Sequence, residues 1–215
     1  MFDVVCRTTE CWSATGDMMA GWGALAAAAA VIYAANRASN TFRAYRRQKQ
    51  EDRRIDAAER ILTLAYSLKR ILTAVRSPMS MGGEIHEAQA QLEEAAWYQG
   101  MNDAQKSKAR IGQVALRRVQ QHKDDWDKIT EMMPMARALF GEDTEANLQT
   151  FWAQVVAVNV SAEMYRDDNG NDPEFTARME RAFWSMGVDR DEIAAHVDEA
   201  ISGLEAELLP IIRAE

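Results

Sequence analysis

The sequence predicts an all-α protein: an N-terminal transmembrane helix continues into a long basic juxtamembrane helix, and an antiparallel helical bundle follows. Three observations lead to this fold class. Residues 18–35 form an uncharged, Ala-rich run, a cluster of cations follows it directly, and the rest of the chain repeats apolar residues every three or four positions. No run alternates apolar and polar residues over the length of a strand.

The apolar run MMAGWGALAAAAAVIYAA lies between Asp17 and Arg37, and nine of its eighteen residues are Ala. As a helix it is about 27 Å long, close to the ~30 Å hydrocarbon core of a bilayer. Trp22 and Tyr33 stand near opposite ends, where their amphipathic rings favour the membrane interface. Small residues recur at spacing four, which lets helices approach closely in lipid. We therefore expect a transmembrane helix over residues 18–36.

Two other interpretations of this run were weighed. An Ala-rich helix can also pack into the subunit interface of a soluble oligomer. A cleaved secretory signal is disfavoured, because its first segment should be basic. Here the first segment carries Asp3, Glu10 and Asp17 against the single cation Arg7.

The cations that follow the run set an expected orientation. Between Arg37 and Arg54 there are seven Lys or Arg residues and two acids. Cationic flanks stay cytoplasmic because they resist translocation and are attracted to anionic lipid. We expect a single-pass protein of the bacterial inner membrane, with residues 1–17 as a short outer tail and the bulk of the chain in the cytoplasm. The cations expected to contact lipid headgroups are Arg43, Arg46, Arg47, Lys49, Arg53 and Arg54.

Both cysteines, Cys6 and Cys11, lie in the expected outer tail. Their C-x4-C spacing, without further Cys or His, is no metal-binding signature. The sequence leaves open whether they form a disulfide or stay as free thiols. Because residues 37–215 contain no Cys, thiol catalysis in the cytoplasmic part is excluded.

The net charge of −8 hides a gradient along the chain. Residues 37–76 carry net +7, and residues 131–215 carry net −12. The acidic part is repelled by an anionic membrane and could dock against the basic helix of its own or a neighbouring chain. The simpler alternative is that both charge sets are solvated faces. Nucleic acid is disfavoured as the partner of the basic run, because the acidic body repels phosphates.

Residues 37–80 are expected to form one basic, coiled-coil-like helix. Neither Pro nor Gly occurs between Gly23 and Pro78, so a helix can continue from the membrane to about Ser77. Apolar residues recur at three and four positions over about two heptads, which is typical of a seam between helices. The expected association seam consists of Ile61, Leu64, Leu68, Ile71 and Val75.

Residues 81–215 are expected to form a cytoplasmic domain of about five helices. One helix should run over residues 84–98, and a second from Asp103 to Met133, where Pro134 should break it. A short helix over residues 135–140 should end at Gly141. Further helix ends are expected at Gly100, at the loop 167–173 and at Gly187. Further helix starts are expected at Asn102, at Asp143 or Thr144, and at Asp189 or Asp191.

Two apolar stripes define the expected core of this domain. Both recur at the spacing of one helix face, and the first is the strongest in the chain. The first consists of Leu148, Phe151, Trp152, Val155, Val158, Ala162 and Tyr165, and the second of Ile193, Val197, Ile201, Leu204, Leu208 and Ile211.

The three histidines match no known catalytic or metal-binding pattern. His86, His122 and His196 lack the Glu-x-x-His spacing of di-iron bundles, and no HExxH occurs. His122 lies on an apolar stripe, where a hydrogen-bonded core histidine is the more common outcome. We therefore expect no catalytic residue among them.

The acidic loop at residues 167–172 fails the calcium-loop pattern. That pattern requires Gly at position six and Glu at position twelve, whereas counting from Asp167 gives Asp172 and Arg178. Phosphate-binding Gly loops and the GxSxG nucleophile elbow are also absent from the sequence. The sequence therefore predicts no metal, no cofactor and no catalytic site.

Three segments carry a resemblance to a known family: AERILTLAYSLKRILTAVRSPM (58–79), PMARALFG (134–141) and QTFWAQVVAV (149–158). Together with the RRQK-type basic stretch, they resemble an uncharacterised bacterial or prophage-borne family of small, single-pass, membrane-anchored helical proteins. The resemblance extends from Trp22 onward. It implies a membrane-anchored helical protein, and it implies no activity and no site residue.

These observations lead to one functional expectation and two alternatives. The expectation is a non-enzymatic, membrane-anchored scaffold that acts by tethering and associates with itself or with a protein partner. The first alternative is a soluble helical assembly protein whose Ala-rich run packs in a subunit interface. The second is a small-ligand sensor or enzyme, with a pocket lined by His122 or by aromatic residues around Trp152.

Overall fold

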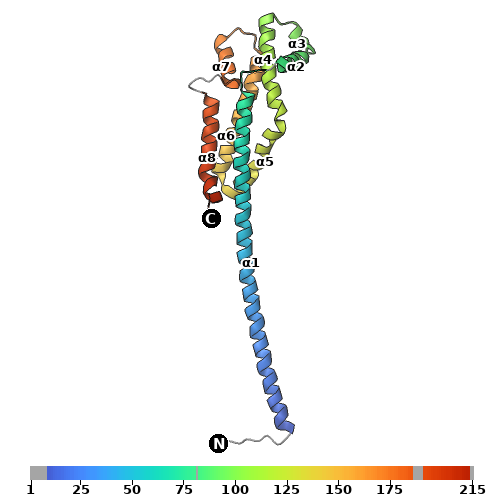
Figure 1. The fold of residues 1–215 in the computed structure, drawn as a ribbon, viewed down its shortest axis with the longest axis vertical. Coiled ribbons are helices and arrows are strands. Elements are labelled where there is room, and N and C mark those ends of the chain that lie inside the picture. The colour runs from blue at the N-terminus through green and yellow to red at the C-terminus, as the bar shows by residue number, and fades with distance from the viewer. Residues whose placement is uncertain (1–8, 81, 186–190, 214–215) are drawn as a thin grey trace. The chain divides into compact units, whose positions relative to one another are not determined.

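The computed structural model describes residues 9–80, 82–185 and 191–213, with side chains from residue 18 onward. Every regular element in these ranges is an α-helix, as predicted (Figure 1). The chain divides into two compact units, Met1–Arg53 and Arg54–Glu215, and we call the second the helical body. The helices are α1 (Thr9–Val75), α2 (Gly82–Glu93), α3 (Ala96–Gln99), α4 (Asp103–Gln121), α5 (Lys123–Phe140), α6 (Glu142–Asp167), α7 (Pro173–Phe183) and α8 (Glu192–Arg213).

The first helix, α1, ends at Val75, close to the predicted end near Ser77. It begins at Thr9, so helical backbone already covers the second half of the segment that we expected to be a tail. The expectations for Cys6 and for the side chain of Cys11 lie outside the described residues.

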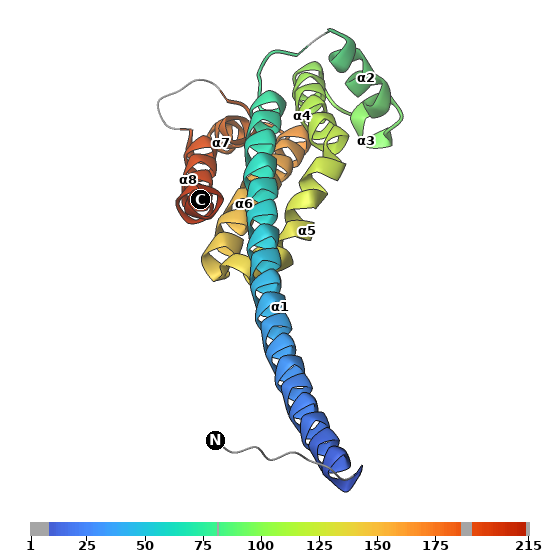
Figure 2. The same cartoon turned by 60° about the horizontal axis from the view of Figure 1, so that its bottom comes forward.

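The core of the helical body is built from the two predicted stripes and from one side of α1. Phe151 and Val158 of α6 and Leu204 and Leu208 of α8 are at most 1% exposed. They pack in one cluster with residues of α1 such as Leu68. In Figure 2 the Arg54–Val75 part of α1 crosses in front of α6, with α8 on one side and α5 on the other.

The central helix of the body is α6, which contacts α4, α5, α7 and α8. Its approach to α4 requires a glycine. A Cβ on Gly112 would lie 2.8 Å from the carbonyl oxygen of Ala162 and 2.8 Å from Cβ of Arg166. These distances are too short for any side chain, so Gly112 lets the two helices pack at close range.

One predicted boundary is wrong, and one break was not predicted. Pro134 does not end a helix but lies inside α5, on its exposed side, where water can satisfy the carbonyl that loses its N–H partner. The break occurs instead at His122, between α4 and α5. Asp124 and Asp125 in the first turn of α5 favour a helix start at this point, because carboxylates stabilise a helix N-terminus.

The remaining boundaries follow local capping chemistry. The predicted helix over residues 84–98 is divided into α2 and α3. Asn102 caps α4 in a reciprocal capping box with Gln105, in agreement with the predicted start. The side chain of Asp172 accepts hydrogen bonds at the start of α7, and Asp191 accepts one from the N–H of Ala194 at the start of α8. The helix that was expected to end at Gly187 already ends at Phe183, and Gly187 itself lies outside the described residues.

Candidate membrane-anchoring segment

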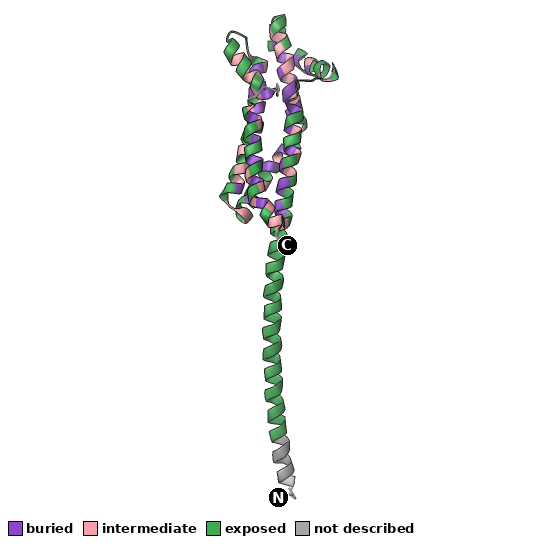
Figure 3. Cartoon of the chain, turned by 60° about the vertical axis from the view of Figure 1, so that its left-hand side comes forward, coloured by how far each residue is buried: buried purple, intermediate pink, exposed green. Residues whose placement is uncertain are grey.

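The N-terminal unit carries its apolar side chains uncovered. From Met18 to Arg53 every side chain is exposed, whereas the helical body has a continuous buried core (Figure 3). The large apolar and aromatic side chains of the predicted span are each between 64% and 74% exposed. They are Met18, Met19, Trp22, Leu25, Val31, Ile32 and Tyr33.

This exposure separates two explanations for an apolar helix. Among the described residues one helix, within Met18–Val75, is long and apolar enough to cross a membrane. A core helix of a soluble protein passes the same test of length and composition, but its apolar residues are covered by the rest of the chain. Here no side chain of the apolar window is buried. A continuous exposed apolar surface of this kind is typical of a segment that contacts lipid or another protein.

The geometry of an α-helix limits the roles of the two interfacial aromatic residues. With a rise of 1.5 Å per residue, Trp22 and Tyr33 lie about 16 Å apart along α1, about half of the hydrocarbon thickness. In a straight helix perpendicular to the bilayer they cannot both lie at opposite interfaces. Tyr33 is the one next to the cationic flank, since its hydroxyl accepts a hydrogen bond from Nε of Arg37 at 3.4 Å.

The cations beyond the apolar run lack acidic partners in the described part of the chain. None of the Lys and Arg residues from Arg37 to Arg53 forms an ion pair there, although Glu51 and Asp52 are close in sequence. Arg46 lies over the ring of Phe42 at 5.8 Å from its centroid. A solvated or anionic environment outside the chain must therefore neutralise this charge. Of the six predicted headgroup contacts, Arg54 alone lies in the helical body.

The predicted association seam divides into two groups. Ile61, Leu68 and Val75 are at most 2% exposed and belong to the core of their own chain. The seam prediction is corrected for these three residues, because their apolar surface is already used within the fold. Leu64 and Ile71 are half-buried at its edge, and Leu64 lines an open hollow of about 590 Å³ between α1 and α5.

Sequence analysis missed two buried arginines that fix the end of α1. Arg76 is 3% exposed, and its Nη1 lies 2.8 Å from Oδ2 of Asp191. Its guanidinium also donates to the carbonyl oxygens of Arg181, Ala182 and Trp184. The Arg76 carbonyl in turn accepts the N–H of Ser185 at 2.8 Å, so one residue ties α1 to the end of α7 and the start of α8.

The second arginine, Arg118 of α4, is 9% exposed. Its Nε and Nη2 donate to the two carboxylate oxygens of Glu84 at 3.0 and 2.7 Å, a bidentate pair. Its other hydrogen bonds go to the carbonyl oxygens of Val75, Ser77 and Met79. Arg118 therefore holds the segment after α1 against α2 and α4. Because these partners are about 34 to 43 residues away in the sequence, no local periodicity reveals them.

The side chains proposed for a ligand pocket have structural partners. His122 lies at the junction of α4 and α5, with Nδ1 3.3 Å from Oδ2 of Asp125. It lines an open hollow of about 440 Å³ that also contains Arg118 and Glu84, the bidentate pair described above. Trp152 is half-buried and packs against the core of the body. The hollow at His122 is open to solvent.

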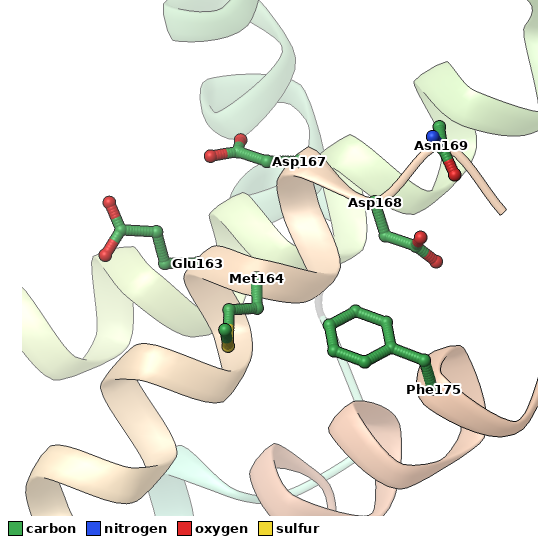
Figure 4. Close-up of a pocket in the computed structure, with 6 residues that line it drawn as sticks. All are labelled: Glu163, Met164, Asp167, Asp168, Asn169 and Phe175. Carbon is green, nitrogen blue, oxygen red and sulfur yellow. The ribbon is translucent and has the colours of Figure 1, made fainter. Parts of the chain in front are cut away.

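The acidic loop borders another hollow, of about 410 Å³ (Figure 4). Met164 and Phe175 lie beside it, and carboxylates stand around them. Asp168 is engaged within the fold, since its Oδ2 meets Nζ of Lys108 at 3.2 Å and the hydroxyl of Thr176. Burial raises the pKa of Asp168, but these hydrogen bonds and that of the Gly170 N–H outweigh burial and lower the pKa below its ordinary value.

The described residues contain no group of three or more His, Cys, Asp or Glu side chains that could hold a metal ion. No protein-family model, curated protein or solved structure matches the chain.

Proposed function

We propose that this chain is a membrane-anchored helical scaffold that acts by tethering. Residues 18–36 would cross the bacterial inner membrane, with the N-terminus outside and the helical body, as an antiparallel bundle, in the cytoplasm. The observation that carries the proposal is the uninterrupted exposure of an apolar stretch followed directly by cations that form no ion pair among the described residues. Lipid satisfies both at once, because acyl chains cover the apolar part and anionic headgroups neutralise the cations.

The organisation of the body supports tethering rather than chemistry. Its two buried arginines, Arg76 and Arg118, bind carboxylates and backbone carbonyl oxygens and so join one helix to another. A scaffold needs only this: a rigid body held at a surface, where confinement raises the effective concentration for weak contacts. The resemblance of residues 58–79, 134–141 and 149–158 to bacterial membrane-anchored proteins supports the same proposal.

Fractionation of cells that express the full chain tests the anchor. We expect the protein in the membrane fraction, resistant to alkaline and high-salt washes and released by detergent. Recovery in the supernatant without detergent would overturn the proposal and favour the soluble assembly, in which the Ala-rich run packs between subunits. A cytoplasm-only reporter fused to the C-terminus should be active, and activity of a periplasm-only reporter at the same position would contradict the orientation.

A matched pair of double variants makes this test specific. Leu25→Arg with Val31→Arg places two charges inside the apolar run, at about 2.5 to 3.5 kcal/mol each for a position near the centre of a span. We expect this variant to lose membrane retention. Ser202→Arg with Ala206→Arg adds the same charge at exposed positions of α8 and should leave retention unchanged.

A further inference from the structure

One helix of the body turns an uncharged side toward solvent. α6 has no charged residue from Ala146 to Ala162, although it belongs to the acidic part of the chain. Three of its outward side chains, Val156, Val160 and Met164, are 41%, 42% and 47% exposed. We use the name α6 outer strip for the exposed residues Ala146, Gln149, Ala153, Val156, Val160 and Met164.

The members of the strip have the spacing of a helix–helix seam. Successive residues are three or four positions apart, so they form one line along the helix, in the pattern of a coiled-coil interface. The other sides of α6 are occupied by α4, α5, α7 and α8. The strip is thus the part of α6 that no described helix of its own chain covers.

The negative charge of the body indicates which partner binds the strip. Residues 131–215 carry net −12, so two copies of the body repel each other wherever their carboxylates meet. From Ala146 to Val160 the strip offers a surface on which two copies can meet without that repulsion, whereas its last member, Met164, lies beside Glu163. We propose that the α6 outer strip packs against the same strip of a second copy of this chain, around a two-fold axis.

The small area of the strip fits an association that becomes strong only when both copies are held in the same membrane. A line of six residues on one helix buries less than the ~800 Å² per partner of a standard interface, so two free bodies should associate weakly. The anchor proposed above would hold all copies in one plane and in one direction, which raises their effective concentration and makes the seam parallel. This step rests on the proposed function, whereas the identity of the contact surface does not.

Single-cysteine cross-linking of the full chain in membranes tests the contact. On a background of Cys6→Ser and Cys11→Ser, Val156→Cys places a thiol in the middle of the strip, and Ser202→Cys places one at an exposed position of α8. Under mild oxidation we expect Val156→Cys to form a disulfide-linked dimer at least about tenfold faster than Ser202→Cys. Equal rates, or no dimer from Val156→Cys, would overturn the proposal.

A charge introduced into the strip provides the second measurement. Val160→Glu, combined with Val156→Cys, opposes two carboxylates at the seam, and we expect the association constant to fall about tenfold or more. Ala206→Glu adds the same charge on α8 and should have no effect. Ala153→Arg repeats the test with the opposite sign of charge if Val160→Glu alters the circular dichroism of the body. Unchanged cross-linking in both strip variants would contradict the inference.

Vesicle flotation of the same samples separates this inference from the anchor. Protein that floats with vesicles but does not cross-link at position 156 supports the anchor and refutes the strip. If the protein does not float, the anchor fails, and cross-linking is measured in solution at high protein concentration. A dimer through position 156 there would support the strip without the membrane, and its absence would refute both.

Discussion

Arginine occurs in two contrasting environments in the two units of this chain. In the helical body, Arg76 and Arg118 are nearly buried, and each meets a carboxylate at 2.8 or 2.7 Å. From residue 37 to residue 53 the arginines are exposed and form no ion pair within the described chain. The two buried arginines therefore have their counter-charges within the body, whereas the charge of the exposed arginines is open to solvent and to external anions.

Apolar side chains show the same contrast. Leu68 and Phe151 are each 1% exposed in the core of the body, whereas Leu25 and Ile32 are 64% and 70% exposed in the N-terminal unit. Burying such a side chain stabilises a fold by about 1.5 to 3 kcal/mol. The body gains this energy within one chain, and the N-terminal unit gains it only from lipid or from another protein.

The largest effect on stability is expected from replacing Arg118, one of the two buried arginines of the body. Arg118→Met removes the bidentate contact with Glu84 and takes a donor away from the carbonyl oxygens of Val75, Ser77 and Met79, so we expect unfolding to become easier by about 3 kcal/mol. Arg137→Met removes an exposed cation that pairs with Glu142 and Glu145, and it should cost at most about 1 kcal/mol. Urea unfolding of the full chain in detergent measures the loss of stability in each variant. Equal losses would contradict the difference between buried and exposed arginines.

Neutralising the unpaired arginines should affect membrane binding but not stability. The triple variant Arg43→Gln, Arg46→Gln and Arg47→Gln should weaken attraction to anionic vesicles by about 3 kcal/mol, at about 1 kcal/mol per cation. The urea midpoint of the body should stay the same, because these side chains belong to the N-terminal unit and form no ion pair among the described residues. A shift of that midpoint, or unchanged dependence on anionic lipid, would show that these arginines have partners in the protein.

The close contact of α4 with α6 predicts a smaller effect on stability. In Gly112→Ala the new Cβ would meet backbone atoms of Ala162 and Arg166 at 2.8 to 2.9 Å, so the helices must move apart, at about 1 to 3 kcal/mol. Gly100→Ala is the control, since its Cβ would have 3.9 Å to the nearest atom. Thermal unfolding should place Gly112→Ala well below Gly100→Ala, and equal melting temperatures would refute the close packing.

The smallest effect is a dependence of stability on acid pH. Burial raises the pKa of Asp191, but the N–H of Ala194 and the guanidinium of Arg76 outweigh it and lower the pKa below 3.8. Folding therefore favours the carboxylate, and its contribution is present above pH 3.8 and is lost as the pH falls through the lower folded value. Asp191→Asn should cost about 1 kcal/mol at neutral pH and flatten the acid limb of the stability curve.

Glu199→Gln, at an exposed position of α8, is the control for the loss of stability at acid pH. It should leave both the neutral stability and the acid limb unchanged. An acid limb that is identical in the wild type and in Asp191→Asn would contradict the assigned role of Arg76.

Helix periodicity predicted much of the fold because it is a local property. The stripes of α6 and α8 are buried as predicted except for Trp152 and Ile211, which are half-buried, since apolar residues at helical spacing need a common core. The contacts of Arg76 and Arg118 were not predictable in this way, because their partners come from distant segments. The seam on α1 illustrates the same limit: its periodicity is real, but the sequence does not say whether the partner is the same chain or another.

Pro134 and the α6 outer strip show two further limits. A proline is a strong local signal for a helix end, yet an exposed position in α5 tolerates it. The strip resembles any apolar stripe in sequence, and its significance depends on which side of α6 the other helices leave uncovered. The candidate anchor, in contrast, follows from composition alone, because a membrane acts on a local stretch of sequence.

The position of residue 28 in a bilayer tests the central claim most directly. On the background of Cys6→Ser and Cys11→Ser, an environment-sensitive fluorophore is attached at Ala28→Cys or at Ser39→Cys in the full chain reconstituted into vesicles. We expect the probe at position 28 to be shielded from aqueous iodide and quenched by lipid-attached spin labels, and the probe at position 39 to be accessible to iodide. Equal access of iodide to both probes would show that the apolar run does not lie in lipid.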